Sequence, residues 1–146
     1  SPSPSPSPLP SPAPAPSPMP SGLINDGKII MRDSTTMTLF DLLENKGEIT
    51  MEGESTLDNS GLLGNAYYHG TITMQDNSTL INDEGKRGLV NKNDAFIVMK
   101  DESTLTNKGE MANEVDSTIT MQDKSTLINE GELDNSYAAI TMQDKS

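Results

Sequence analysis

The segment Ile119–Ala139 reads ITMQDKSTLINEGELDNSYAA, and its first nine residues recur along most of the chain. Related phrases begin at Ile29, Ile49, Ile72, Ile97 and Ile119, and a truncated copy, ITMQDKS, begins at Ile140. The starts are separated by 20, 23, 25, 22 and 21 residues. A period near twenty is typical of a solenoid, in which each repeat forms one coil that stacks on the preceding one. We therefore expect function to reside in a long surface or in assembly rather than in a catalytic pocket.

Each repeat carries the pattern of three short strands joined by three corners. Ile119 and Met121 fall on the inward face of a first strand, and Leu127 and Asn129 fall on the inward face of a second. A polar corner, QDK, separates these strands, and Gly131 lies in the next corner, where we expect it to adopt positive φ. A third, more variable side completes the coil. The β-branched residues and the Asn/Gly/Asp punctuation oppose a helical interpretation.

The predicted fold class is all-β: a right-handed parallel β-helix, or β-solenoid, of about 5–6 coils with roughly 20–25 residues per coil. The right hand follows from the general rule for parallel crossover connections. One local exception is expected at Met37–Glu44 (MTLFDLLE), which resembles a short helical turn.

The chain divides into an arm, residues 1–20, and a β-solenoid repeat domain, residues 21–146. All ten prolines occupy the even positions from Pro2 to Pro20. Proline fixes φ and lacks a backbone donor, so the arm is predicted to be extended and polyproline-II-like. Its exposed serine hydroxyls resemble those of O-glycosylated arms of extracellular wall proteins, so glycans are candidate partners of the arm.

Composition excludes several classes of function. The net charge of −12 opposes binding to nucleic acid, which requires clustered Lys and Arg. The absence of cysteine excludes disulfides, thiolate metal sites and cysteine nucleophiles. No apolar run is long enough to span a bilayer, so membrane insertion is not expected. The chain contains five aromatic residues, which suits a thin aliphatic solenoid core better than an ordinary globular one.

Stacked coils place like residues above like, so the repeat predicts columns of identical side chains. The methionine column, interpreted as flexible core filler, contains Met31, Met51, Met74, Met99, Met121 and Met142. An asparagine ladder, interpreted as structural, contains Asn25, Asn45, Asn59, Asn82, Asn107 and Asn129. A second set with a similar role contains Asn65, Asn91, Asn113 and Asn135.

The phrases STLTNKG (Ser103–Gly109) and STLINEG (Ser125–Gly131) carry a resemblance to a known architecture. The chain after Ser21 resembles the right-handed parallel β-helix of secreted adhesins and autotransporter passenger domains. The resemblance implies adhesion or formation of surface fibres, and an extracellular location. It supplies no catalytic residues, and we expect the protein not to be an enzyme.

An acidic column occupies the corner after each methionine strand. Asp76, Asp101, Asp123 and Asp144 would lie in a row, with Asp33 in the first copy and Gly53 in the second. The favoured interpretation is that each carboxylate bonds to the backbone of its own turn. The alternative is a calcium site formed by Asp76, Asp101, Asp123 and Asp144, because hard cations prefer oxygen ligands. No other cofactor is expected.

Two further surface features carry weaker hypotheses. The outward residue between Ile and Met forms a β-branched stripe, for which ice binding is the less favoured interpretation and strand preference or lateral packing the favoured one. The stripe contains Ile30, Thr50, Thr73, Val98, Thr120 and Thr141. His69 is the single histidine and has no obvious catalytic partner, whereas Tyr67 and Tyr137 recur in one coil phase.

The two ends of the repeat domain predict assembly. The segment from Ser21 reads as the closing side of a coil, and the segment from Ile140 reads as an opening side. The predicted interface comprises Ser21, Gly22, Leu23, Ile24 and Asn25 of one copy with Ile140, Thr141, Met142, Gln143 and Asp144 of another. Such heterologous contacts repeat without closing.

The predicted function is therefore a structural subunit that stacks head-to-tail into an extracellular β-solenoid filament, with itself as partner and lateral bundling as a second contact. The alternative is a binding module, the fragment of a surface adhesin or fibre shaft displayed on a proline-rich stalk.

Overall fold

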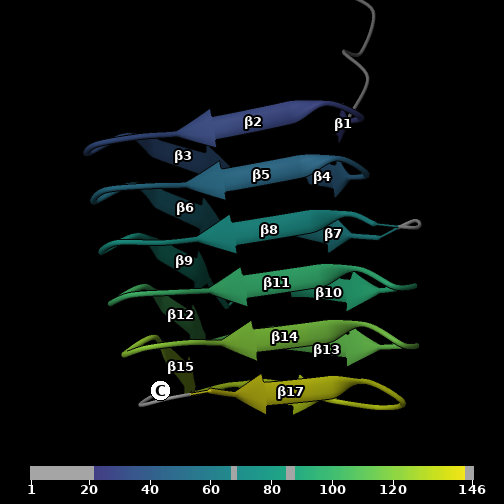
Figure 1. The fold of residues 1–146 in the computed structure, drawn as a ribbon. Coiled ribbons are helices and arrows are strands. Elements are labelled where there is room, and N and C mark those ends of the chain that lie inside the picture. The colour runs from purple at the N-terminus through teal and green to yellow at the C-terminus, as the bar shows by residue number, and fades with distance from the viewer. Residues whose placement is uncertain (1–21, 67–68, 85–87, 144–146) are drawn as a thin grey trace, which may run out of the picture.

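The computed structural model describes residues 22–66, 69–84 and 88–143. Within these ranges the chain forms seventeen short β-strands and no helix. The strands wind into about five coils stacked along one axis, as Figure 1 shows from the side. The predicted all-β parallel solenoid is thus confirmed for the repeat domain, whereas the arm lies outside the described residues.

Three parallel sheets form the sides of the solenoid. Sheet I contains β2 (Lys28–Met31), β5 (Glu48–Met51), β8 (Thr71–Met74), β11 (Phe96–Met99), β14 (Thr118–Met121) and β17 (Ala139–Met142). Sheet II contains β3 (Thr36–Leu39), β6 (Thr56–Asn59), β9 (Thr79–Asn82), β12 (Thr104–Asn107) and β15 (Thr126–Asn129). Sheet III contains β1 (Leu23–Asn25), β4 (Leu42–Asn45), β7 (Leu62–Asn65), β10 (Gly88–Lys92), β13 (Glu110–Glu114) and β16 (Glu132–Asp134).

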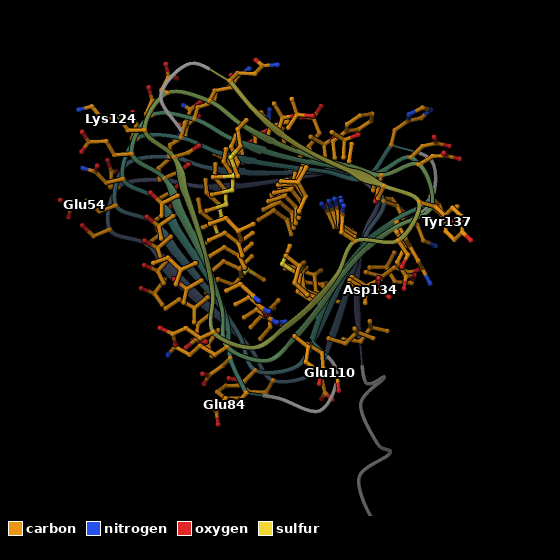
Figure 2. The ribbon with its side chains drawn as sticks, turned by 90° about the horizontal axis from the view of Figure 1, so that it is seen from below. Glu54, Glu84, Glu110, Lys124, Asp134 and Tyr137 are labelled. Atoms are coloured by element: carbon orange, nitrogen blue, oxygen red, sulfur yellow. The ribbon has the colours of Figure 1, made fainter. Side chains whose placement is uncertain are left out.

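The winding is right-handed, as the crossover rule predicts. In Figure 1 the nearer strands of sheet I run to the left, the chain returns behind them, and each coil lies below the previous one. Figure 2 looks along the axis, and the side chains of successive coils superimpose in it.

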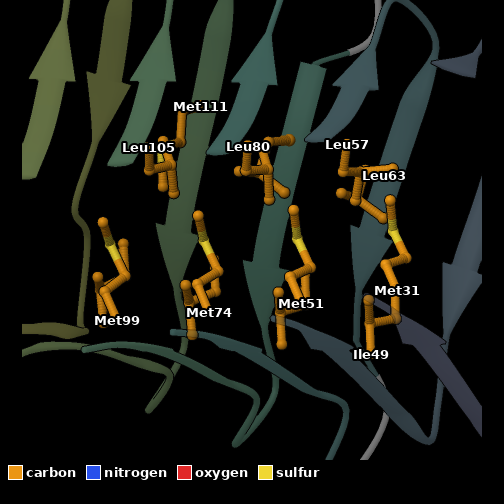
Figure 3. Packing of buried hydrophobic residues seen from close by; sticks show 14 of the residues in the cluster. Met31, Ile49, Met51, Leu57, Leu63, Met74, Leu80, Met99, Leu105 and Met111 are labelled. Atoms are coloured by element: carbon orange, nitrogen blue, oxygen red, sulfur yellow. The ribbon is translucent and has the colours of Figure 1, made fainter. Parts of the chain in front are cut away.

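The core is a narrow column of aliphatic side chains that points inward from all three sheets. Strands of the inner coils alternate half-buried and buried residues, because successive side chains point to opposite faces. Ile49, Met51, Leu57 and Leu63 are at most 1% exposed, and Figure 3 shows their equivalents repeating from coil to coil. Each such side chain contributes roughly 1.5–3 kcal/mol through burial.

The methionine column is confirmed by the pairing register. Met31 pairs with Met51, and the same register continues through every strand of sheet I to Met121 and Met142. Met31 is 3% exposed, but Met142 at the other end is 63% exposed because no later coil covers it within the described residues.

The asparagine ladder must be corrected, because the structure contains two ladders with different members. On sheet III, side-chain hydrogen bonds of 2.7–2.8 Å join Asn25, Asn45, Asn65, Asn91, Asn113 and Asn135. On sheet II, bonds of 2.6–2.8 Å join Asn59, Asn82, Asn107 and Asn129. Asn25 and Asn45 therefore belong with the second predicted set. In the first full coil, Leu39 occupies the sheet II position and pairs with Asn59.

The helical turn predicted at Met37–Glu44 is wrong. These residues form parts of β3 and β4, which pair in parallel with β6 and β7. The apparent helical spacing arises because one strand ends and the next begins within eight residues, with Phe40 and Asp41 at the corner between them. Tertiary pairing overrides the local preference of Leu and Glu for helix.

The reason given for the corner glycine is also wrong. Positive φ occurs at Gly22, Gly53 and Gly88, and Gly131 is not among these residues. A Cβ on Gly131 would instead collide with the carbonyl oxygen of Gly109 in the coil above. Glycine is needed at this corner because successive backbones approach closely there.

Candidate assembly surfaces

The C-terminal coil leaves inward-pointing side chains uncovered. Ile140, Leu127 and Leu133 are half-buried, whereas their counterparts in the inner coils are fully buried. Strands β15, β16 and β17 are each the last strand of their sheet within the described residues. This end therefore presents three strand edges around an apolar centre.

The N-terminal coil forms a matching end. Strands β1, β2 and β3 terminate sheets III, I and II at the opposite end of the solenoid. Leu23 and Ile24 are 50% and 54% exposed, whereas Asn25 and Met31 remain buried. An edge of this kind is a template for pairing with another strand.

The backbone gives these edges a direction. Thr56 donates its N–H to the Thr35 oxygen of the preceding coil at 2.8 Å, and Glu52 donates to the Met31 oxygen at 2.9 Å. In a parallel strand the N–H and C=O of one residue point to the same side, and neighbouring residues alternate. Outward residues therefore direct their polar groups toward the N-terminal end, and inward residues direct theirs toward the C-terminal end.

The sheet III ladder has the same polarity. In every rung the Nδ2 of one asparagine donates to the Oδ1 of the asparagine in the following coil. At the C-terminal end Asn135 Nδ2 makes a 3.4 Å bond to the Ala138 oxygen, and at the N-terminal end Asn25 Oδ1 accepts from Gly27 N–H at 3.3 Å. One end thus presents the ladder's donor and the other end its acceptor.

The described residues of the predicted interface lie at the two ends of the solenoid. Leu23, Ile24 and Asn25 form β1, and Ile140, Thr141 and Met142 belong to β17, at opposite ends of the solenoid in Figure 1. Gly22 and Gln143 flank these strands and are exposed. Ser21 and Asp144 lie outside the described residues. Within one molecule the two halves of the predicted interface do not meet.

The acidic column has a backbone role. Positive φ values of 56–59° occur at its four described aspartates, Asp33, Asp76, Asp101 and Asp123. Gly53 adopts a φ of 68° at the equivalent position. Aspartate tolerates this left-handed region better than most residues do, which explains why each of these corner positions is either Asp or Gly.

The carboxylates bond to the preceding coil rather than to their own turn, which corrects the favoured interpretation. Asp76 Oδ2 accepts from Gly53 N–H at 2.9 Å, and Asp101 Oδ2 accepts from Asp76 N–H at 3.2 Å. These bonds connect coils along the corner. The sequence could not reveal this, because the repeat does not specify which coil a side chain faces.

An open groove of about 420 Å³ follows this corner and is lined by Asp76, Asp101, Asp123, Glu102 and Lys124, together with Asn77. Lys124 Nζ lies 2.9 Å from Glu102 Oε1, and this hydrogen bond raises the pKa of Lys124. Among the described residues, no three His, Cys, Asp or Glu side chains are grouped closely enough to hold a metal ion. Asp144, the fourth predicted calcium ligand, lies outside those residues.

The outward faces of sheets I and II are rich in threonine. The predicted sheet I stripe lies outward as expected, with Thr50 and Thr73 paired in register. Sheet II carries an unbroken column that the sequence reasoning missed, formed by Thr36, Thr56, Thr79, Thr104 and Thr126. The signal was present in the repeated Ser-Thr-Leu phrase, whose threonine points outward in each coil.

The remaining predicted surface residues do not form a common site. His69 is exposed at φ 92°, and its carbonyl accepts from Thr71 Oγ1 at 3.1 Å. Tyr137 is 90% exposed at φ 55°. Tyr67, its predicted equivalent, lies outside the described residues.

The described part of the chain contains no helix that is long and apolar enough to cross a membrane. No family model, no curated protein and no solved structure matches this chain.

Proposed function

We propose that the protein is a structural subunit that stacks head-to-tail into a β-solenoid filament. The observation that carries this proposal is the matched polarity of its two ends. At the C-terminal end, the backbone N–H and C=O groups of inward residues face outward along the axis, together with the donor of the sheet III ladder. At the N-terminal end, the backbone groups of outward residues face outward along the axis, together with the acceptor of the ladder. A second copy of the chain fits such an end because it repeats the same register.

The joint follows from the order of the strands. β17 of one copy would pair with β2 of the next, placing Ile140 and Met142 over Ile29 and Met31, which continue the same columns inside the molecule. β16 would pair with β1 of the next copy, so that Asn135 would donate to Asn25. Sheets I and III then continue across the joint. The contact is heterologous, and repeating it gives an open filament.

The second candidate function is a binding module of a surface adhesin. In that case we expect the chain to form single short rods that do not stack. The extracellular location belongs to the proposal and rests on the resemblance to secreted β-helices. Glycan attachment to the Ser/Pro arm and lateral bundling of filaments are further parts of the proposal, and the sequence alone supports them.

The test is electron microscopy and sedimentation of the purified full chain, compared with Met142→Lys and Thr141→Lys. Met142 continues the inward methionine column at the last strand of sheet I and is already 63% exposed, so we expect Lys to leave the subunit folded while placing a charge between stacked copies. Thr141 is exposed on the outer face of the same strand and serves as the matched control. We expect filaments from the wild type and Thr141→Lys, and short rods from Met142→Lys. Short rods from all three would contradict stacking and favour the binding module.

A second pair of variants tests the ladder. Asn135→Asp keeps the oxygen that accepts from Asn113 but removes the donor aimed at the next copy. Tyr137→Asp adds the same charge at an exposed corner nearby and leaves the ladder intact. We expect the critical concentration for assembly to rise on the order of tenfold or more with Asn135→Asp, because a hydrogen bond is lost and two acceptors face each other. An equal effect of both variants would contradict the ladder's role.

A further inference from the structure

Tyr137 occupies a corner position at which the two preceding coils carry aspartate. Strands β11, β14 and β17 pair in register, which makes Asp94, Asp116 and Tyr137 equivalent residues of the corner between sheets III and I. All three adopt positive φ, at 58°, 58° and 55°. Aspartate tolerates this left-handed backbone, whereas a bulky aromatic residue rarely adopts it. Tyr137 therefore carries a backbone cost that the two aspartates largely avoid.

Packing of the ring does not offset this cost. Tyr137 is 90% exposed, and Figure 2 shows it projecting from a corner of the solenoid. Its backbone is nevertheless held in place, because Asp116 donates its N–H to the Tyr137 oxygen at 2.8 Å and Ala139 donates to the Ser117 oxygen at 3.0 Å. Residues held in unfavourable backbone conformations gather at sites that contact ligands. An exposed aromatic ring on a fixed backbone is therefore a candidate ligand contact.

The same coil also opens a space beside the ring. The two preceding strands of sheet I begin with Phe96 and Thr118, whereas β17 begins with Ala139 at the equivalent position. A hollow of about 370 Å³ lies here. Its lining comprises Asp116, Ser117, Thr118, Tyr137, Ala138 and Ala139. The ring and the space beside it thus occur together in one coil, on the side of the solenoid.

The polar groups of the hollow are few and differ in their availability. Asp116 is exposed, and Thr118 lies on the outer face of β14, where it is half-buried. The Ser117 hydroxyl is already engaged inside the solenoid, where it lies 2.9 Å from both the Asn91 carbonyl oxygen and Asn113 Oδ1. The hollow therefore offers one aromatic face, one carboxylate and one hydroxyl above small side chains.

We propose that this hollow binds a neutral carbohydrate, with one sugar ring stacked on Tyr137 and sugar hydroxyls bonded to Asp116 and Thr118. A sugar ring has a face of C–H groups that packs on an aromatic ring, and its hydroxyls donate to a carboxylate and accept from a threonine hydroxyl. An anionic ligand would meet Asp116 in a chain of net charge −12. A metal ion would find too few ligands, since no three His, Cys, Asp or Glu side chains are grouped in the described part of the chain.

A proline-rich peptide is the other common ligand that stacks on tyrosine. Such peptides dock in grooves that several aromatic rings line. Of the described residues that line this hollow, Tyr137 alone is aromatic. Proline also has no N–H to donate to Asp116. The combination of one ring with a carboxylate therefore fits a sugar better than it fits a proline-rich peptide.

This site goes beyond the proposed stacking and does not depend on it. The hollow spans two neighbouring coils within one subunit, so a single rod displays it once. A stacked filament would repeat it once per subunit along the same corner. Such repetition raises the avidity for a polymeric glycan without adding any contact.

The test is NMR titration of the full chain carrying Met142→Lys, with cellohexaose, maltohexaose and mannohexaose as separate probes. We expect one of these saccharides to shift the amide signals of Thr118, Tyr137 and Ala139. Tyr137→Ala should weaken that binding on the order of tenfold, and Tyr137→Phe should retain it, because the ring supplies the stacking contact. Phe40→Ala is the matched control, since it removes a 78% exposed ring from another corner.

Three outcomes would overturn the proposal. They are unshifted signals with all three saccharides, equal weakening by Tyr137→Ala and Phe40→Ala, and a response at these signals to a synthetic Ser-Pro decapeptide but to no saccharide.

A second pair of variants tests the carboxylate. Asp116→Asn keeps a residue that tolerates positive φ but replaces the charged acceptor, and Asp94→Asn makes the same change at the equivalent corner position two coils before Tyr137. We expect saccharide binding to weaken on the order of fivefold in Asp116→Asn and to stay unchanged in Asp94→Asn, because hydrogen bonds to a charged acceptor are the stronger ones. Equal affinities of the two variants would contradict the role of Asp116.

Discussion

Positive φ decides which residues this solenoid accepts at its corners. At the corner between sheets I and II, every left-handed position among the described residues carries Asp or Gly. At the corner between sheets III and I, the same backbone is adopted by Asn93, Val115 and Tyr137. Valine is the poorest choice of the three, because its β-branched side chain crowds the left-handed backbone.

Val115 therefore provides a test of this backbone requirement. It has φ 48° and is 47% exposed, so its side chain gains little from packing. Val115→Asn copies the residue that stands at Asn93 in the coil above, and we expect it to stabilise the protein by about 1 kcal/mol. Urea denaturation measures the change. Val115→Ala is the control: alanine shortens the side chain without favouring positive φ, and a gain equal to that of Asn would contradict the explanation.

At the scale of elements, the asparagine ladders join the coils inside the core. Asn82 accepts from Asn59 at 2.8 Å and donates to Asn107 Oδ1 at 2.6 Å and to the Glu110 oxygen at 2.9 Å. Buried amide groups must be satisfied in this way, because burial without a partner is costly. Each ladder thus fixes the register of its sheet while it satisfies its own polar groups.

Replacing one rung shows how much the ladder contributes. Asn82→Leu substitutes the residue that occupies this position naturally at Leu39, and it leaves the buried Asn107 oxygen without its ladder donor. We expect a loss of roughly 2–4 kcal/mol in unfolding free energy, measured by urea denaturation. Asn129→Leu is the matched control, because Asn129 is exposed and ends the ladder. Equal losses for the two variants would contradict a cooperative ladder.

The sequence predicted the sheet II ladder correctly wherever the spacing between a methionine and the following asparagine is constant. Met51, Met74, Met99 and Met121 each precede an asparagine by eight positions, and that sheet II alignment is correct. Met31 breaks the rule, since Leu39 stands eight positions later and Asn45 belongs to sheet III. The alignment failed there because identical letters occupy two sides of the coil, and the three-dimensional pairing decides between them.

The bonding of the charged corners and the polarity of the two ends could not be predicted from the sequence for a different reason. A repeat states which residues stack, but it does not state in which direction a polar group points along the axis. The bond from Gly53 N–H to Asp76 and the donor at Asn135 both depend on that direction. The repeat pattern therefore predicts the coil, whereas the direction of its polar groups along the axis follows only from the three-dimensional structure.

At the scale of the whole molecule, charge is concentrated away from two of the three faces. The outward positions of sheet II carry one charged residue, Asp58, and those of sheet I carry Lys28 and Glu48, which form a 3.1 Å ion pair. Acidic residues gather instead at the corners and on sheet III, where Glu110 and Asp134 are labelled in Figure 2. The two threonine faces are thus nearly neutral within a molecule of net charge −12.

We expect this distribution to make the proposed end-to-end growth sensitive to ionic strength. Two subunits approaching along the axis bring together acidic corners of the same sign, and their repulsion reaches about 30 Å at 0.01 M salt but about 8 Å at 0.15 M. We expect filament elongation, followed by light scattering, to be faster at the higher sodium chloride concentration.

Calcium chloride at equal ionic strength separates screening from specific binding at Asp76, Asp101 and Asp123. Because those carboxylates already bond to backbone N–H groups, we expect the two salts to act alike and EDTA to leave Tm unchanged. A rise in Tm with calcium alone, reversed by EDTA, would instead assign the acidic column to a metal.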